Sequence, residues 1–229
     1  MESFSFRQRV ISYILKGIVI LGVLVGVILS AKLGEDAFMG GSTVFMYFTI
    51  QSNIAIAIVS LIGLCYMISK KHICYVWYVI KLVGTVSITL TGAVFTVVLA
   101  PTMGADAWNM ANLLTHVIVP VSAIADFFVT GINTKYRKID ILYVVIPPLL
   151  YAVYAGIGYA CDWKFSKTAN YPYFFLNWGS KAGAFGFSSE LPFIGVVWWI
   201  LLLLGLLIGV GFLYVFIAKK LREKFIENN

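Results

Sequence analysis

Charged residues are scarce in this sequence. Only 12% of the 229 residues are Asp, Glu, Lys or Arg, whereas 61% are hydrophobic and the mean hydropathy is +0.93. Soluble domains have about 25% charged and roughly 45–50% apolar residues, which excludes a soluble globular fold. The ten-residue segments of alternating hydrophobicity that build a membrane β-barrel are also missing. We therefore expect a helical integral membrane protein.

Metal-binding side chains are equally few. The two histidines, His72 and His116, are predicted to lie at opposite ends of the bilayer, and the three cysteines have no metal-ligand spacing. Cys65 and Cys74 should lie near the inner face and Cys161 near the outer face, so no disulfide framework is expected. We predict no metal and no cofactor.

Long apolar runs separated by short polar segments predict an all-α fold, a bundle of six transmembrane helices. They leave no room for a separate soluble domain, so residues 1–229 are predicted to form a single six-helix transmembrane domain. The predicted spans are about 10–32, 43–68, 75–99, 107–130, 139–160 and 191–218.

The net charge of +7 would suggest a nucleic-acid partner for a soluble protein, but here the basic residues follow the topology. Cytoplasmic segments of membrane proteins are enriched in Lys and Arg, so we predict that both termini are cytoplasmic and that nucleic acid is not a partner. Attraction to anionic membrane lipids is a secondary effect. Of the 17 basic residues, 11 fall on the predicted cytoplasmic side: Arg7, Arg9, Lys70, Lys71, Lys135, Arg137, Lys138, Lys219, Lys220, Arg222 and Lys224.

Lysines inside the predicted spans need an explanation, because a charge in lipid is costly. Lys16 is near the start of the first span, and we expect it to reach back to the interface as a lipid-facing anchor. Lys81 and Asp126 lie at similar depths in the third and fourth spans, so we predict that they form a structural ion pair.

Polar residues gather in the second span, in the stretch FMYFTIQSN at positions 45–53. Thr49, Ser52 and Asn53 are three or four residues apart and share one helix face, which should point into the bundle, while Gln51 points elsewhere. Hydroxyl and amide groups inside a membrane either join helices or form a site.

The fourth span carries a matching polar stripe, Asn109, Asn112 and His116, at positions i, i+3 and i+7. Pro120 follows one turn later and should kink the helix, freeing a carbonyl group. At 1.5 Å rise per residue, His116 lies roughly 14 Å from the outer end of its span and Thr49 roughly 9 Å from the end of its own, near one level.

This placement predicts a hydrolytic site. A threonine hydroxyl is a weak nucleophile unless a base, usually histidine, lies within about 2.6–3.2 Å to take its proton. Thr49 is the predicted nucleophile and His116 the general base. A site inside the bilayer selects substrates dissolved there, so a lipid ester is the predicted substrate. Substrate contacts or oxyanion donors are expected among five polar residues: Ser52, Asn53, Thr89, Asn109 and Asn112.

The longest connection, from Cys161 to Glu190, is rich in aromatic residues. Ordered loops of this length are often lids or binding loops, and Trp and Tyr also favour the membrane interface. We expect this loop to fold back over the outer mouth of the bundle, either to cover a site or as an interfacial aromatic belt.

Three short motifs accompany the six spans: FTIQSN at 48–53, THVIVP at 115–120 and YPYFFLN at 171–177. Together they resemble the androgen-induced gene one and FAR-17a family of six-helix membrane proteins, in its bacterial form. The resemblance implies a threonine hydrolase of fatty acid esters of hydroxy fatty acids, with Thr49 and His116 as its essential residues, in a bacterial cytoplasmic membrane.

Two other functions fit the same residues. A carrier or sensor for a lipid or small amphiphile would use Asn109, Asn112 and His116 as hydrogen-bonding contacts without catalysis. A structural membrane protein would use its polar residues only to join helices.

Overall fold

A computed structural model describes residues 5–33, 41–70 and 72–227 of the chain. Within these ranges, six helical segments are long and apolar enough to cross a membrane, which confirms the predicted all-α, multi-pass membrane fold. The side on which the termini lie stays a prediction, and Lys71 lies outside the described residues. The six segments are Phe6–Lys32, Phe48–Ile68, Tyr75–Trp108, Met110–Asn133, Lys138–Ala160 and Val196–Lys224.

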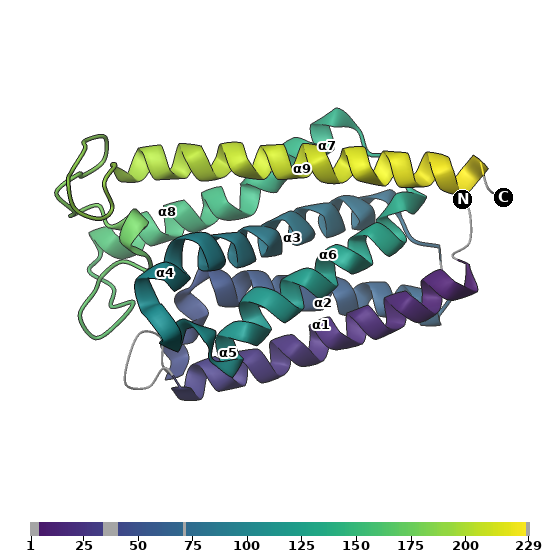
Figure 1. Ribbon diagram of the computed structural model, residues 1–229, viewed down its shortest axis with the longest axis horizontal. Coiled ribbons are helices and arrows are strands. Elements are labelled where there is room, and N and C mark those ends of the chain that lie inside the picture. The colour runs from purple at the N-terminus through teal and green to yellow at the C-terminus, as the bar shows by residue number, and fades with distance from the viewer. Residues whose placement is uncertain (1–4, 34–40, 71, 228–229) are drawn as a thin grey trace.

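The helices run side by side along one axis (Figure 1). Helices α1 (Phe6–Leu33), α2 (Phe48–Ile68), α3 (Tyr75–Val94) and α6 (Val119–Thr130) pack against one another. Helices α8 (Ile146–Ala160) and α9 (Val196–Glu227) lie along the other side of α3. Helix α1 begins and α9 ends at one end of the bundle, here called the termini end. The connection 161–195 lies at the opposite end, here called the loop end.

Several spans consist of more than one helical segment. The second span starts at Phe48, because residues Gly41–Met46 form a 3₁₀ turn (η1) before it. The last starts at Val196, because the main chain of Gly195 bonds to the loop carbonyl of Gly186. The third continues beyond α3 as a π-helix (η2, Phe95–Leu99), a short helix (α4, Ala100–Met103) and a 3₁₀ turn (η3, Gly104–Trp108).

Prolines divide the other interrupted spans. The fourth starts with a short helix (α5, Met110–Leu113) and a π-helix (η4, Leu114–Ile118), and Pro120 is the second residue of α6, which follows. The fifth consists of α7 (Lys138–Leu142), a 3₁₀ turn (η6, Tyr143–Val145) and α8, in which Pro147 is one of the first residues. Proline has no N–H to donate to the preceding turn, so a helix is interrupted where it occurs.

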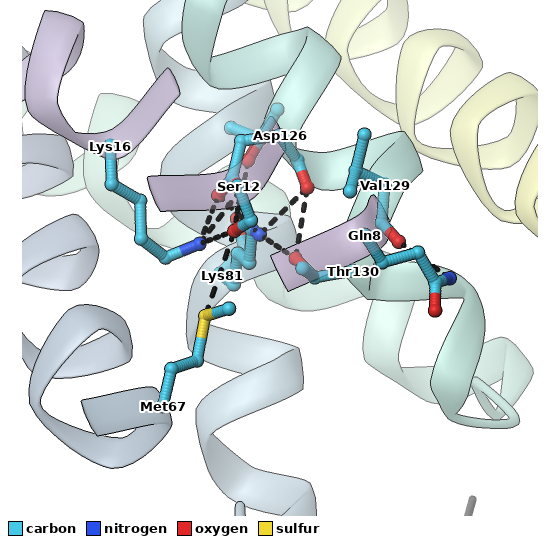
Figure 2. A network of polar contacts seen from close by, with 9 residues as sticks. Gln8, Ser12, Lys16, Met67, Lys81, Asp126, Val129 and Thr130 are labelled. Atoms are coloured by element: carbon cyan, nitrogen blue, oxygen red, sulfur yellow. Dashed lines mark hydrogen bonds and ion pairs between the residues drawn. The ribbon is translucent and has the colours of Figure 1, made fainter. Parts of the chain in front are cut away.

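A buried charge network joins three helices in the half of the bundle nearer the termini end (Figure 2). The carboxylate of Asp126 on α6 accepts hydrogen bonds from Lys81 Nζ on α3 at 2.6 Å and from Lys16 Nζ on α1 at 2.6 and 2.7 Å. Ser12 Oγ donates to the same carboxylate at 2.5 Å, and Lys81 also bonds Thr130. The predicted Lys81–Asp126 ion pair is therefore present.

The prediction for Lys16 was wrong. Its side chain has no exposed surface and points into the bundle, where it shares the carboxylate with Lys81. A carboxylate has two oxygens and can accept hydrogen bonds from two cations. Lys16 therefore bonds Asp126 inside the protein and does not extend to the membrane interface. Gly63 leaves room for this lysine, because a Cβ there would lie 2.8 Å from Lys16 Cε.

We expect Asp126→Asn to lower the free energy of unfolding by about 3–5 kcal/mol, because it leaves two buried lysines without a counter-ion. Lys16→Met should cost clearly less, since it leaves one lysine facing one aspartate. Thermal unfolding in detergent would compare the two variants with the wild type.

Asp162→Asn is the matched control, since Asp162 makes its ion pair with Lys164 on the exposed surface. It should change stability by no more than about 1 kcal/mol. If Lys16→Met destabilised the protein as much as Asp126→Asn, the view that Asp126 is the shared counter-ion of two buried lysines would be wrong.

Candidate active site

Thr49, His116 and a tyrosine from the loop meet in the half of the bundle near the loop end. Thr49 Oγ1 lies 3.4 Å from His116 Nε2 and 3.3 Å from the hydroxyl of Tyr173. All three side chains are buried. The structure thus brings together the two residues proposed to react and adds a third. The Thr49–His116 distance is slightly longer than the usual range for a catalytic base, as it often is before substrate binds.

The start of α2 determines how Thr49 and Tyr173 meet. Thr49 is in the first turn of α2, where main-chain N–H groups have no partner within the helix. The Tyr173 hydroxyl oxygen accepts the Thr49 N–H at 3.3 Å. The same hydroxyl oxygen lies 3.3 Å from Thr49 Oγ1, and either hydroxyl group can be the donor in that contact. Donation by Tyr173 would leave the Thr49 proton for His116.

The hydrogen bonds of His116 select its tautomer. Its Nδ1 lies 3.1 Å from the carbonyl oxygen of Asn112, which can only accept a hydrogen bond. It also lies 3.0 Å from Thr115 Oγ1, whose own proton is donated to the carbonyl of Ala111. Nδ1 therefore carries the proton. The unprotonated Nε2 faces Thr49, as a general base must.

Irregular helix geometry and stacking hold the imidazole in place. His116 lies within the π-helix η4, and π-helical turns often occur at functional sites. Phe95, in the π-helix η2, stacks on the imidazole with ring centres 3.9 Å apart and planes 20° apart. Pro120 has no N–H for the carbonyl of His116, as predicted from the sequence. That carbonyl packs against Gly92 of α3.

Ser52 and Asn53 adjoin the pair but support the main chain, contrary to the role predicted for Asn53. The two N–H groups of the Asn53 amide are both used, by the carbonyls of Thr49 at 2.8 Å and Thr115 at 3.0 Å. Asn53 therefore has no N–H left for an oxyanion. Ser52 bonds the Thr49 carbonyl and the hydroxyl of Thr91 on α3. Both side chains hold the first turn of α2 in place through these hydrogen bonds.

The other three predicted contact residues are engaged away from the Thr49 hydroxyl. Thr89 bonds the hydroxyl of Tyr214 on α9, because the 100° turn per residue sends it to a different face of α3 from Thr91. The side chain of Asn109 caps α5, and that of Asn112 bonds the carbonyl of Ala107. Asn112 still serves the site through its main-chain carbonyl, which the side-chain prediction did not foresee.

A small apolar cavity of about 70 Å³ adjoins Thr49 and Tyr173. This volume accommodates water-sized molecules and is below the roughly 300–1,000 Å³ of typical ligand sites. The side chains that border it are almost all apolar and come from α2, α3, α8, α9 and the loop. They include Phe48, Leu90, Val94, Tyr151, Phe175 and Leu203.

The loop packs into the loop end of the bundle, as predicted for one that folds back over it. Phe165 is fully buried, and its carbonyl accepts a hydrogen bond from the hydroxyl of Tyr47 at 2.6 Å. Tyr173 stacks on Phe175 with ring planes 5° apart. Burial raises the pKa of the Tyr173 hydroxyl, so this group stays protonated and able to donate.

Sequence analysis did not identify Tyr173 as a site residue. The signal was present in YPYFFLN, a motif within the loop that carries the family resemblance. Nothing in the motif distinguishes Tyr173 from Tyr171, because which hydroxyl reaches Thr49 depends on how the loop packs.

No three His, Cys, Asp or Glu side chains in the described parts of the chain are grouped as metal ligands. The polar side chains that meet at Thr49 are hydroxyl groups and one imidazole. Comparison of the chain with protein-family models, curated proteins and solved structures finds no match.

The contact between Gly92 and the His116 carbonyl is testable. A Cβ at position 92 would lie 2.8 Å from that oxygen, which is main chain and cannot easily move aside. We expect Gly92→Ala to destabilise the protein by about 1–3 kcal/mol in thermal unfolding. Gly205→Ala is the control, because a Cβ there meets open space on α9; it should be neutral or slightly stabilising. Equal behaviour of the two variants would contradict the close packing inferred here.

Proposed function

We propose that the protein is an intramembrane hydrolase of lipid esters, with Thr49 as nucleophile and His116 as general base. The observation that carries the proposal is the tautomer of His116. The carbonyl of Asn112 holds the proton on Nδ1, so the lone pair of Nε2 faces the Thr49 hydroxyl at 3.4 Å. A general base needs an unprotonated nitrogen close to the hydroxyl that it deprotonates, and this arrangement supplies one.

The proposed reaction has two halves. In the first, Thr49 Oγ1 attacks the ester carbonyl while His116 Nε2 takes the hydroxyl proton, giving a tetrahedral intermediate. When the alcohol leaves, it takes that proton from His116, and the acyl group remains on Thr49. In the second, His116 activates a water molecule, which releases the fatty acid and restores the threonine.

Tyr173 is the proposed donor to the oxyanion. Its hydroxyl lies 3.3 Å from Thr49 Oγ1, adjacent to where the carbonyl oxygen of a bound ester would acquire charge. Asn53 cannot take this role, because both of its N–H groups are used by main-chain carbonyls. A single oxyanion donor in a water-poor site can contribute about 3–4 kcal/mol to transition-state stability.

The apolar surroundings favour a lipid substrate. Thr49 and Tyr173 open onto a cavity bordered by hydrophobic side chains within the membrane-spanning part of the fold. The sequence resemblance to the androgen-induced gene one and FAR-17a family also favours esters of hydroxy fatty acids. We further propose that the protein acts in a bacterial cytoplasmic membrane, with both termini in the cytoplasm and other membrane lipids around it.

Thr49→Ala and His116→Ala should each abolish turnover of a lipid ester by purified protein, whereas Thr49→Ser should keep part of it, because serine retains the hydroxyl. A fluorophosphonate probe should label the wild type at Thr49 and leave Thr49→Ala unlabelled. Full ester turnover in both alanine variants would refute the proposal. Tight binding of the ester by the wild type without turnover would favour a carrier.

Tyr173→Phe should lower the turnover number by about 10²–10³-fold with a smaller effect on KM, because it removes a donor used mainly in the transition state. Tyr171→Phe is the matched control: it removes a hydroxyl two residues away without altering the hydrogen bonds of Thr49, and should be close to wild type. If Tyr173→Phe kept wild-type turnover, Tyr173 would be a loop anchor and not an oxyanion donor.

A further inference from the structure

A cavity bordered by charged side chains lies where α9 passes the connection between the fourth and fifth spans. It has a volume of about 530 Å³, within the range of ligand-binding sites. Lys135 borders it from the segment after η5 (Gly131–Asn133), and Lys219, Arg222 and Glu223 border it from α9. We call this cavity the basic pocket.

The basic pocket lies at the level where the spans end. The fourth spanning segment ends at Asn133, two residues before Lys135, and the sixth ends at Lys224, five residues after Lys219. Helix α9 packs against η5 and α7 in this region, at the termini end of the bundle. Residues at the ends of spanning segments lie at the level of the lipid headgroups, so these are what the pocket faces.

Positive charge in the basic pocket is only partly balanced. Lys135, Lys219 and Arg222 give three positive charges and Glu223 gives one negative charge, an excess of two positive charges. The Glu223 carboxylate lies 3.8 Å from Lys219 Nζ, and both side chains are more than half exposed, so this pair contributes little. The side chains of Lys135 and Arg222 make no ion pair with the residues that the structure describes. The pocket therefore favours an anion.

The donors at the border of the pocket suit a phosphate group. The guanidinium of Arg222 has N–H groups in a planar fork that matches two phosphate oxygens, and lysine ammonium groups bind phosphate as point charges. The hydroxyl of Thr134, which also borders the pocket, adds an uncharged donor. Basic pockets between membrane helices bind the headgroups of anionic lipids through such donors.

The face of α9 that borders the pocket becomes apolar toward the middle of the bilayer. Val215, four residues before Lys219, also borders the pocket, and Phe212 lies seven residues before Lys219 on the same helix face. Phe212 is exposed. A lipid held by its phosphate group would therefore have an apolar surface for its acyl chains, whereas a free phosphate ion would gain nothing from that surface.

We propose that the basic pocket binds the phosphate group of an anionic phospholipid, with Lys135, Lys219 and Arg222 as its cationic contacts and the acyl chains along the apolar part of the same face of α9. This site is separate from the candidate active site and does not depend on the proposed hydrolase function. It also differs from a general attraction between a basic surface and anionic lipid, because binding is assigned to particular side chains and not to their basic neighbours.

The test is native mass spectrometry of the full-length protein in detergent, which counts the lipid molecules that remain bound to it. Dioleoyl phosphatidylglycerol is the anionic probe. Dioleoyl phosphatidylcholine is its control, since it has the same acyl chains and a phosphate group but no net charge. We expect the wild type to bind one molecule of phosphatidylglycerol at least about fivefold more tightly than phosphatidylcholine.

A pair of adjacent lysines on α9 provides the decisive comparison. Lys219→Gln should weaken the binding of phosphatidylglycerol about fivefold and leave that of phosphatidylcholine unchanged. Lys220→Gln is the matched control, because it removes the same charge from the next residue, which is also exposed but does not border the pocket. It should bind both lipids like the wild type.

Lys135→Gln tests the opposite side of the pocket and should act like Lys219→Gln. Both side chains are exposed, so neither change should disturb folding. The midpoint of thermal unfolding in detergent without added lipid checks this.

Equal affinity of the wild type for the two lipids would overturn the proposal, as would equal weakening by Lys219→Gln and Lys220→Gln. A further arm adds inorganic phosphate to the lipid-free protein and measures the midpoint of thermal unfolding. We expect no stabilisation that depends on Lys219. If inorganic phosphate stabilised the wild type and Lys220→Gln but not Lys219→Gln, and the wild type did not prefer phosphatidylglycerol, the pocket would be a site for free phosphate and the lipid assignment would be wrong.

Discussion

A polar group inside the hydrocarbon layer must find its partner within the protein, and this constraint organises both halves of the bundle. Toward the termini end, a single carboxylate on α6 holds lysines from α1 and α3. Toward the loop end, the amide of Asn53 joins the first turn of α2 to the π-helix η4. The helices most closely packed together, α1, α2, α3 and α6, are those that these polar contacts connect.

The polar cluster around Asp126 is made of charged side chains, whereas the cluster around Thr49 is made of hydroxyl groups and an imidazole. The Asp126 network contains three ionisable side chains at bonding distance, an arrangement that ties three helices together. The Thr49 cluster has hydroxyl groups and one imidazole, and it borders an apolar cavity. A general base requires a neutral imidazole, and among the described residues the His116 ring bonds two hydroxyl groups and one carbonyl. A main-chain carbonyl orients the ring instead.

The depth of a residue, calculated from the rise per residue along its helix, predicted contacts correctly where depth alone decides which side chains meet. It brought Thr49 and His116 to one level and paired Lys81 with Asp126. It failed where the direction of a side chain decided the outcome. Lys16 was expected to reach the interface, but its ammonium group bonds both oxygens of the Asp126 carboxylate instead. Asn53 faced the site as predicted, yet the main-chain carbonyls of Thr49 and Thr115 use its donors. Thr89 lies two residues from Thr91, far enough around α3 to face Tyr214 instead.

Sequence patterns alone establish the class of fold, because the main-chain polar groups of an apolar run that crosses a bilayer can be bonded there only within a helix. They also establish which spans carry polar groups and at what depth, since the rise of a helix is constant. The hydrogen bonds that select the tautomer of His116, and the place of Tyr173 beside Thr49, are visible only in the folded structure. The tautomer depends on the local geometry of a π-helix. The place of Tyr173 depends on how the loop packs, through contacts between residues distant in the chain. Periodicity and composition contain no information on either feature.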